Sequence, residues 1–344
     1  MSSISNVPPP LGVHPDRASA AKSANRQDRV FILVIQLVAL FTLIVIAAVA
    51  VFVFIAGWPS FRANGFGWFT SGPMPLDQQL GLSFTGNPDG STYTKLNAWP
   101  AIAGTILTTG GALLIAFPIS LLTAVFLAEL APRRVANFLS PIVTMLAATP
   151  SVVFGLFAIL VLGPWMTEHL VSQSVANELA IIVPIGGTSV LLAMIVLAVM
   201  IAPLMTAIFT DALRAVPTKW KEGAIALGCD PWRMSRRVSI TAIRPALVAG
   251  SSLAIGRAVG EAIAVSMAGG GIAFVPNPLD GIWFFFQPVR PLAATVVDYS
   301  EGFDGDVLRA NLFAIGVVLF ITTAALTIGA KIASASAAKR LGGS

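Results

Sequence analysis

Charged residues are scarce in this chain of 344 residues. Only 11% of the residues are charged, whereas 56% are hydrophobic and the mean hydropathy is +0.84. An average soluble domain carries about a quarter charged residues, so most of this chain cannot face water. The composition therefore predicts an integral membrane protein.

Cysteine and histidine are almost absent. The single cysteine, Cys229, excludes an internal disulfide bond. The only histidines, His14 and His169, lie far apart in the sequence and are too few to form a metal-ligand set. We therefore expect neither a disulfide nor a metal site.

Motifs of catalysis and nucleotide binding are also missing. The chain has no G-x-x-x-x-G-K-[ST] phosphate loop, no H-E-x-x-H zinc motif and no G-x-S-x-G nucleophile motif. We therefore expect no enzyme activity, no bound cofactor and no nucleic acid partner. If the protein moves a solute uphill, the energy has to come from another chain or from an ion gradient.

Long apolar segments dominate what is present. Six of them are long enough to cross a bilayer as a helix, which takes about 20 residues. They cover about residues 30–56, 102–130, 136–162, 188–209, 242–270 and 308–334. We predict an all-α integral membrane protein with six transmembrane helices. No internal repeat is evident, which argues against a secondary transporter built from inverted repeats.

The basic residues lie mainly in one set of loops. Sixteen of them fall at the two ends of the chain, in the turn around 133–134 and in the loop 211–241 and its flank, against four in the other loops. By the positive-inside rule, both termini and the 211–241 loop are cytosolic. The polar residues 1–29 are interpreted as a disordered cytosolic tail before an uncleaved first span.

The loop with the most detailed local signals is residues 216–240, VPTKWKEGAIALGCDPWRMSRRVSI. Thr218 can cap a first short helix, and Gly228 is a natural left-handed stop. Asp230 can cap a second helix that has Pro231 at its first position, where proline is favoured. The pattern predicts a helix–glycine–helix elbow that a partner could grip, although an ordinary amphipathic loop would explain it equally well.

Arg257 and Glu261 lie in the apolar segment GRAVGEAIAV, residues 256–265. A charge in a membrane span costs a few kcal/mol on insertion scales. If the helix is continuous, the i, i+4 spacing places the two side chains within pairing reach. Gly256 and Gly260 form a G-x-x-x-G pair, which predicts close packing against another helix.

Two interpretations of this charged pair remain open. In the first, Arg257 and Glu261 neutralise each other and mark only a polar seam. In the second, Arg257 faces a substrate path and offers an oxyanion a planar donor fork, which Glu261 orients. Several hydroxyl groups could line the same path, or could bond their own helix backbone instead. They are Thr149 and Ser151 beside Pro150, and Thr105, Thr108 and Thr109 in an earlier span.

The 216–240 loop resembles the "EAA" loop of ABC-importer permeases. The pattern of that loop is E-A-A, three residues, G, nine residues and I-x-L-P; here Gly223 replaces the middle alanine and Thr241 the final proline. The resemblance implies that the elbow is a coupling helix that docks in a groove of a cytosolic ATPase. The docking residues that it implies are Glu222, Gly223, Ala224, Leu227 and Gly228.

A wider resemblance covers about residues 30–335. The segments NAWPAIAGTILTTGGALLIAFPISLLTAVFLAELAP (97–132), ATPSVVFGL (148–156) and GRAVGEAIAV together resemble the PstC-type permeases of high-affinity phosphate importers. One departure is Ala262, where this family usually has threonine after the glutamate. The resemblance implies that the Arg257–Glu261 pair matters for transport.

The resemblance also implies an architecture. It predicts a type I ABC-importer permease (MetI-like) core of five helices over residues 102–336, with the coupling loop at 211–241. Residues 30–101 would form the first transmembrane helix and an extracytoplasmic loop, and residues 337–344 a cytosolic tail.

The implied partners are a second permease of the PstA type, a dimer of PstB-type ATP-binding subunits that use ATP and Mg²⁺, and a PstS-type phosphate-binding protein outside the cell. The implied location is the bacterial plasma membrane, in contact with lipid. Two alternatives remain: a permease for another oxyanion such as sulfate or molybdate, or an ion-coupled secondary transporter or channel that uses Arg257 and Glu261.

Overall fold

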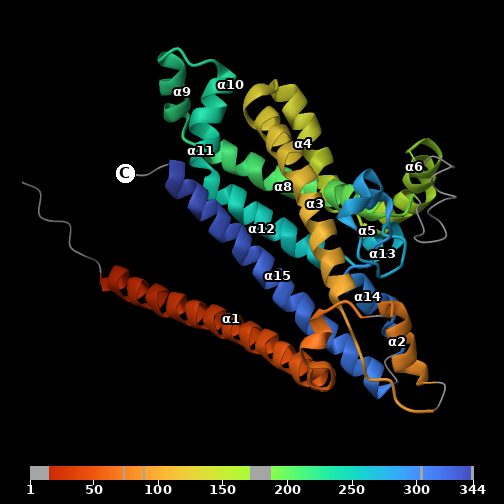
Figure 1. The fold of residues 1–344 in the computed structure, drawn as a ribbon. Helices are drawn as coiled ribbons and strands as arrows, with labels where there is room; N and C mark the ends of the chain where they lie inside the picture. Colours follow the sequence, from red (N-terminus) through yellow and green to blue (C-terminus); the bar gives the residue numbers. More distant parts are fainter. Residues whose placement is uncertain (1–14, 73, 88–89, 171–186, 303–304, 342–344) are drawn as a thin grey trace, which may run out of the picture. The chain divides into compact units, whose positions relative to one another are not determined.

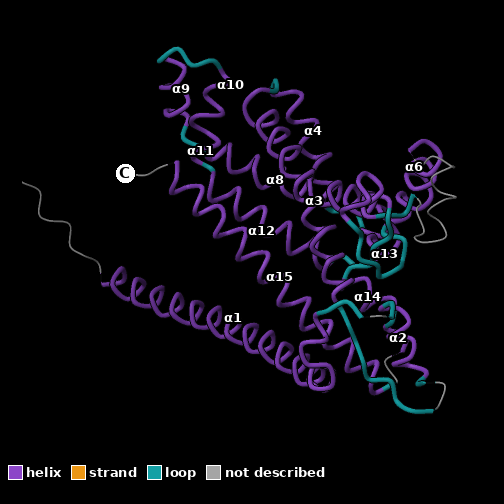
Figure 2. The backbone as a smooth tube through the Cα atoms, in the orientation of Figure 1, coloured by secondary structure: helices purple, strands orange, loops and turns teal. Residues whose placement is uncertain are grey.

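The computed structural model describes residues 15–72, 74–87, 90–170, 187–302 and 305–341 (Figure 1). Helices joined by loops make up the described backbone, as Figure 2 shows. Within these residues, the only β pairing is an isolated bridge between Gly270 and Val289. The chain divides into two compact units, Met1–Phe52 and Val53–Ser344.

The first unit contains the N-terminal part of one long helix, α1 (Pro15–Asn64). From residue 31 to residue 49 every side chain of α1 is exposed, and this stretch is strongly apolar, so it suits contact with lipid. The predicted disordered tail is wrong for residues 15–29, because α1 already begins at Pro15. Alanine is the best helix former and the segment 18–24 holds four alanines, which explains the extension. Residues 1–14 lie outside the described part of the chain.

The second unit contains all remaining helices. The apolar spanning segments are Trp99–Leu130, made of α3 (Trp99–Val125) and η2 (Phe126–Leu130); Ser151–Leu170, made of α5 (Ser151–Phe157), η3 (Ala158–Leu162) and α6 (Gly163–Leu170); α8 (Val190–Ala215); and the first part of α15 (Asp306–Leu341). With α1 they make five candidate spans, and a bent helix pair at 231–260 brings the number to six.

Shorter elements connect and flank these spans. They are η1 (Gly65–Phe69), α2 (Leu76–Thr85), α4 (Arg133–Ala147), α9 (Thr218–Ala226), α10 (Pro231–Met234), η4 (Ser235–Ser239), α11 (Ile240–Ala242), α12 (Arg244–Gly260), α13 (Ile263–Ala268), η5 (Pro278–Phe286), α14 (Leu292–Asp298) and η6 (Ser300–Gly302). In the second unit, α9 and α10 lie at one end of the helix bundle, and α2 and α14 lie at the other (Figure 1).

Two of the predicted spans are broken. The third span was expected to run through 136–162, but α4 ends at Ala147 and α5 begins only at Ser151. Pro150 cannot continue the helix, and it also disfavours helical geometry at Thr149. The fifth span was expected to be continuous over 242–270, but α12 ends at Gly260 and α13 starts at Ile263. The other spans are confirmed, with shifted ends.

Helix α8 forms the centre of the second unit. Most of its side chains are buried, and it packs along α3, α4 and α12. Small residues of α3 and large residues of α8 form the core, and the Ser120 hydroxyl ties the two helices by donating to the Ala202 carbonyl at 3.0 Å. The α3–α8 pair is therefore the most closely joined part of the bundle.

A second core lies at the end that holds α2. Trp68 is fully buried against leucines of α2, and its indole N–H donates to the Ser60 hydroxyl at 3.2 Å. Ser60 in turn donates to Asn311 of α15 at 2.6 Å. A Cβ added at Gly57 would lie only 2.7 Å from the Ala314 nitrogen, so glycine is required for this approach of α1 to α15. These contacts fix the segment 53–69 on α15.

Candidate functional site

The two helix breaks lie side by side. Helix α13 packs against α5, and a Cβ added at Gly155 would lie 2.8 Å from Met267 Sδ and 3.1 Å from Ala264 Cα. The break after α4 and the break after α12 therefore belong to the same region of the bundle. In membrane proteins, discontinuous helices expose backbone groups and helix ends that can bind ions and polar substrates.

Arg257 links the two breaks. It lies in the last turn of α12, is half-buried, and its Nη1 donates to the Ala147 carbonyl, the last residue of α4, at 3.4 Å. A cation is favoured at a helix C-terminus because the unpaired carbonyls carry partial negative charge. No other hydrogen bond or ion pair of this guanidinium occurs within the described residues, so the remaining N–H groups of its donor fork stay free.

Glu261 is used differently from the prediction. Because α12 ends before it, Glu261 has extended backbone geometry (φ −74°, ψ 117°), and its Oε1 accepts a hydrogen bond from the Ala264 N–H of α13 at 3.1 Å. The predicted Arg257–Glu261 ion pair is absent from the described contacts. The i, i+4 argument fails because it requires a continuous helix. Each charge is stabilised by the end of a helix instead.

Among the described residues, the predicted glycine strip packs against no other helix. Apart from the nearby backbone of α12 itself, no described atom lies within 4 Å of a Cβ added at Gly256 or at Gly260. Both glycines belong to a partly open side of α12, where Leu253 is also exposed. Close packing of this strip against another helix stays a prediction.

The hydroxyl groups divide into two sets. Thr149 and Ser151 flank Pro150 at the first break and are half-buried; Thr149 donates to its own helix at the Met145 carbonyl, 3.2 Å away. The three threonines of α3 are fully buried and do not face an open path: Thr105 and Thr108 donate to their own backbone, and all three are at most 3% exposed, Thr109 included. Of the hydroxyl candidates, the structure places only Thr149 and Ser151 at the helix breaks.

The predicted elbow is present before the N-terminal end of α12, away from the two helix breaks. Helix α9 begins at Thr218 with Pro217 as its cap residue, so Thr218 itself is not the cap. Gly228 has φ +83° and ends the helix, and the Asp230 carboxylate caps α10 by accepting from the Arg233 N–H at 2.8 Å. Two short helices joined by a left-handed glycine are therefore confirmed.

The surface of this elbow is exposed and partly apolar. Helix α9 has no buried residue; Glu222 and Gly223 are exposed, Ala224 is half-buried, and Leu227 is 88% exposed. Trp220, Ile225 and Trp232 add further exposed apolar side chains. A cluster of exposed apolar side chains with a charged rim is typical of a protein interaction site.

Sequence reasoning missed the contact that attaches this elbow to the bundle. Lys221 of α9 forms an ion pair with Glu129 of η2, with 2.9 Å between Nζ and Oε1, and the Glu129 side chain is only 2% exposed. Glu129 is the only acidic residue between Asp89 and Glu168, which marks it as unusual but does not reveal its partner.

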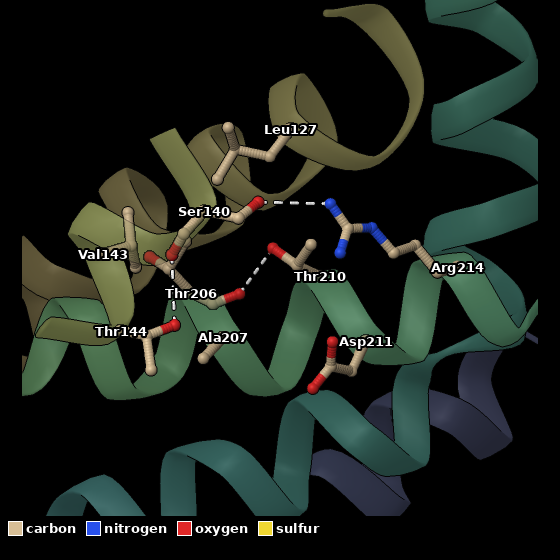
Figure 3. Close-up of a pocket in the computed structure, with 9 residues that line it drawn as sticks. All are labelled: Leu127, Ser140, Val143, Thr144, Thr206, Ala207, Thr210, Asp211 and Arg214. Carbon is tan, nitrogen blue, oxygen red and sulfur yellow. Dashed lines mark hydrogen bonds between the residues drawn. The ribbon is translucent and has the colours of Figure 1, made fainter. Parts of the chain in front are cut away.

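A small pocket lies near this contact, between η2, α4 and α8 (Figure 3). Arg214 reaches across it and donates to the Ser140 hydroxyl at 3.2 Å. The hydroxyl protons of Thr144, Thr206 and Thr210 are already donated to backbone carbonyls. The lining holds one cation, Arg214, and one carboxylate, Asp211, so the pocket offers an oxyanion no net positive charge.

A network of charges stabilises the other end of the bundle. Arg290 forms ion pairs with Asp77 of α2 and Asp298 of α14, and it also donates to the Gly271 carbonyl. Burial and the neighbouring Asp77 carboxylate raise the pKa of the Tyr299 phenol, so this group stays protonated and donates to Asp77 Oδ1 at 3.2 Å. The Ser266 hydroxyl of α13 donates to Asp298 at 2.8 Å, which connects the network to the second helix break.

Removal of the cation from this network is expected to destabilise the fold. Arg290→Met leaves two partly buried carboxylates without a cation, which should cost about 2–4 kcal/mol. The thermal unfolding midpoint of the purified protein should fall clearly. Arg309→Met is the matched control, because Arg309 pairs with the exposed Asp306 and such pairs contribute about 0–1 kcal/mol. Equal midpoints for both variants would contradict the structural role of Arg290.

Comparison with known proteins decides the family. A model of the "binding-protein-dependent transport system inner membrane component" family matches residues 116–341, which include the exposed elbow and both helix breaks. The chain belongs to this family. The permease is therefore a multi-pass inner-membrane component of a transport system that works with other subunits, and not an enzyme.

Curated relatives match this permease over most of its length. It is 29% identical over 336 residues to the phosphate transport system permease protein PstC of Mesorhizobium japonicum, covering 94% of each chain. It is 31% identical to PstC of Haemophilus influenzae, covering 85% of this chain and 88% of that protein. Among solved structures, the methionine ABC transporter MetNI aligns over 71% of this chain and 93% of the other, with a TM-score of 0.44 and 18% identity.

Proposed function

We propose that the permease forms, together with a second permease, the pathway that takes inorganic phosphate into the cell in an ATP-driven importer. The substrate is suggested by relatives that carry the name phosphate transport system permease protein, one of which matches 94% of this chain and another 85%. The observation that carries the pathway is Arg257, a partly free guanidinium at the junction of two broken helices.

The chemistry of this junction suits a phosphate ion in transit. A guanidinium offers parallel N–H groups that match two phosphate oxygens. Thr149 and Ser151 lie at the same break. The Ser151 hydroxyl can donate to an anion, whereas the Thr149 hydroxyl would first have to release the Met145 carbonyl. Glu261 holds α13 in place through its capping bond and limits how strongly an anion binds nearby.

The open side of α12 suits a second permease. Gly256 and Gly260 would let the helix of a PstA-type partner approach closely, so that the substrate path lies between the two chains. A dimer of PstB-type ATP-binding subunits, which use ATP and Mg²⁺, would dock on the elbow at Glu222, Gly223, Ala224, Leu227 and Gly228. The elbow and both termini would then be cytosolic in a bacterial plasma membrane, and a PstS-type binding protein would deliver phosphate to the opposite end.

The expected result for the substrate is uptake of labelled phosphate that depends on this chain and continues in excess sulfate. Uptake is measured in cells with and without the permease, and the same cells are tested with labelled sulfate and molybdate. Inhibition by sulfate would contradict the choice of phosphate while leaving the importer architecture intact. Gradient-driven flux through the purified chain alone in liposomes would contradict the ATP-driven mechanism.

A further inference from the structure

Glu129 is a buried acidic residue with no part in the proposed pathway. It lies in η2, at the end of α3, and its side chain is 2% exposed. A buried carboxylate is costly unless it is paired and hydrogen-bonded. Its position next to the elbow raises the question of which segments this buried carboxylate connects.

Glu129 gathers three segments of the chain at one point. Its Oε1 pairs with Lys221 Nζ of α9 at 2.9 Å, and its Oε2 accepts a hydrogen bond from the buried Ser235 hydroxyl of η4. The same Lys221 amine also donates to the Leu213 carbonyl of α8 at 2.9 Å. One buried carboxylate therefore connects the end of α3 with the elbow, and one amine connects the elbow with the end of α8.

Few side-chain bonds attach α9 to the bundle. None of its residues is buried, and Lys221 is the only described side chain of α9 that forms a hydrogen bond or an ion pair. Two covalent connections leave the helix: Val216 and Pro217 join it directly to α8, and α10, η4 and α11 lead to α12 with a bend of 71° between α11 and α12. Neither connection reaches α3, which α9 contacts through the Glu129–Lys221 ion pair.

We propose that Glu129 is a positioning residue that transmits movement of α9 to the end of α3. The inference rests on the proposed function, in which an ATPase moves the elbow. Helices α3 and α8 are closely packed and further tied by the Ser120–Ala202 hydrogen bond. A displacement of α9 therefore reaches α8 through residues 216–217 and α3 through Glu129 and Lys221, so that both helices shift together.

The test compares E129Q with the double variant E129Q/K221M in the complete importer reconstituted in proteoliposomes. E129Q keeps the size of the side chain but leaves the Lys221 cation without its carboxylate. The double variant removes both charges, so no uncompensated buried charge remains. R214Q is the control, because it removes an exposed polar contact at the same end of α8 and should leave uptake unchanged.

Two quantities are measured for each variant: the amount of ATPase subunit that co-purifies, and phosphate uptake per assembled complex. We expect uptake per complex to fall about tenfold in both Glu129 variants, in the range reported for residues that carry coupling between sites. Co-purification should stay unchanged in both variants. The thermal unfolding midpoint should fall in E129Q and recover in the double variant.

Three outcomes would overturn the proposal. Normal uptake in E129Q would show that the contact is not needed. Recovery of uptake together with stability in the double variant would show a purely structural role, because the connection is still missing there. Loss of the ATPase subunit from both variants would show that Glu129 shapes the docking surface instead. A different result would contradict the proposed function: a wild-type complex that hydrolyses ATP but takes up no phosphate. Glu129 would then be tested separately, by comparing how much assembly with the permease changes the rate of ATP hydrolysis in the wild type and in E129Q.

Discussion

Replacement of Arg257 with alanine is expected to lower ATP-driven phosphate uptake by about 100-fold or more. The substitution removes the donor fork at the junction of the two helix breaks, where hydrogen bonds to a charged group contribute about 1.5–3 kcal/mol each. Loss of two such bonds accounts for the expected size of the effect. The measurement is the initial rate of labelled phosphate uptake in vesicles that contain the complete importer.

The conservative variant separates direct contact from a general need for positive charge. Arg257→Lys keeps the charge but loses the planar fork, so uptake should fall by an amount close to that of the alanine variant. Near-normal uptake in Arg257→Lys would argue against bidentate contact with phosphate. Arg244→Lys, the same change in the first turn of α12, is the matched control and should leave uptake unchanged.

Neither variant is expected to unfold the protein. Arg257 makes a single described hydrogen bond, to the Ala147 carbonyl, and the neighbouring side of α12 is open. A thermal unfolding midpoint close to that of the wild type is therefore part of the prediction. A large drop in the midpoint would show that Arg257 holds α4 in place, which is the structural interpretation of this residue.

Charge reversal on the elbow should strongly weaken assembly of the permease with the ATP-binding subunit. Glu222→Lys is expected to abolish co-purification of the ATP-binding subunit, because truncating or reversing a charge buried at an interface costs about 2–5 kcal/mol. Glu222 is exposed and has no ion pair among the described residues, so the fold of the permease itself should not change. The measurement is the ratio of ATPase subunit to permease after affinity purification.

The control for this experiment is Glu301→Lys. Glu301 is an exposed acid in η6, which contacts α14, so the same charge change is made at the end of the bundle away from the elbow. Retained co-purification in the Glu222 variant would contradict the docking role of α9. Loss in both variants would point to the net charge of the chain instead of a specific contact.

The parts of this structure that follow from local chemistry could be predicted from the sequence. A glycine at the end of α9 and an aspartate followed by proline at the start of α10 are sufficient to form the elbow. Hydrophobic runs likewise located four of the six spans as single segments. Within the elbow, only the cap of α9 was predicted wrongly, because Pro217 occupies the cap position and Thr218 becomes the first helical residue.

The break after α12 could not be predicted in the same way. No proline lies between Arg244 and Glu261 apart from Pro245 in the first turn, and the segment is rich in small apolar residues, so the local sequence favours a continuous helix. The break is stabilised by packing of α13 against α5 and by the Glu261 cap. The contact between Glu129 and Lys221 likewise joins residues that are distant in the sequence, and no local pattern reports it.

The length of the bond between Arg257 and Ala147 has a consequence for the speed of transport. At 3.4 Å it lies beyond the usual range for an N–H···O bond, so this bond from a charged donor contributes at the low end of about 1.5–3 kcal/mol. An arriving anion has to displace only this long resting contact, which corresponds to about a tenfold bias in occupancy. The resting state therefore adds almost nothing to the energetic barrier for phosphate entry, and the rate should be limited by movement of the helices instead.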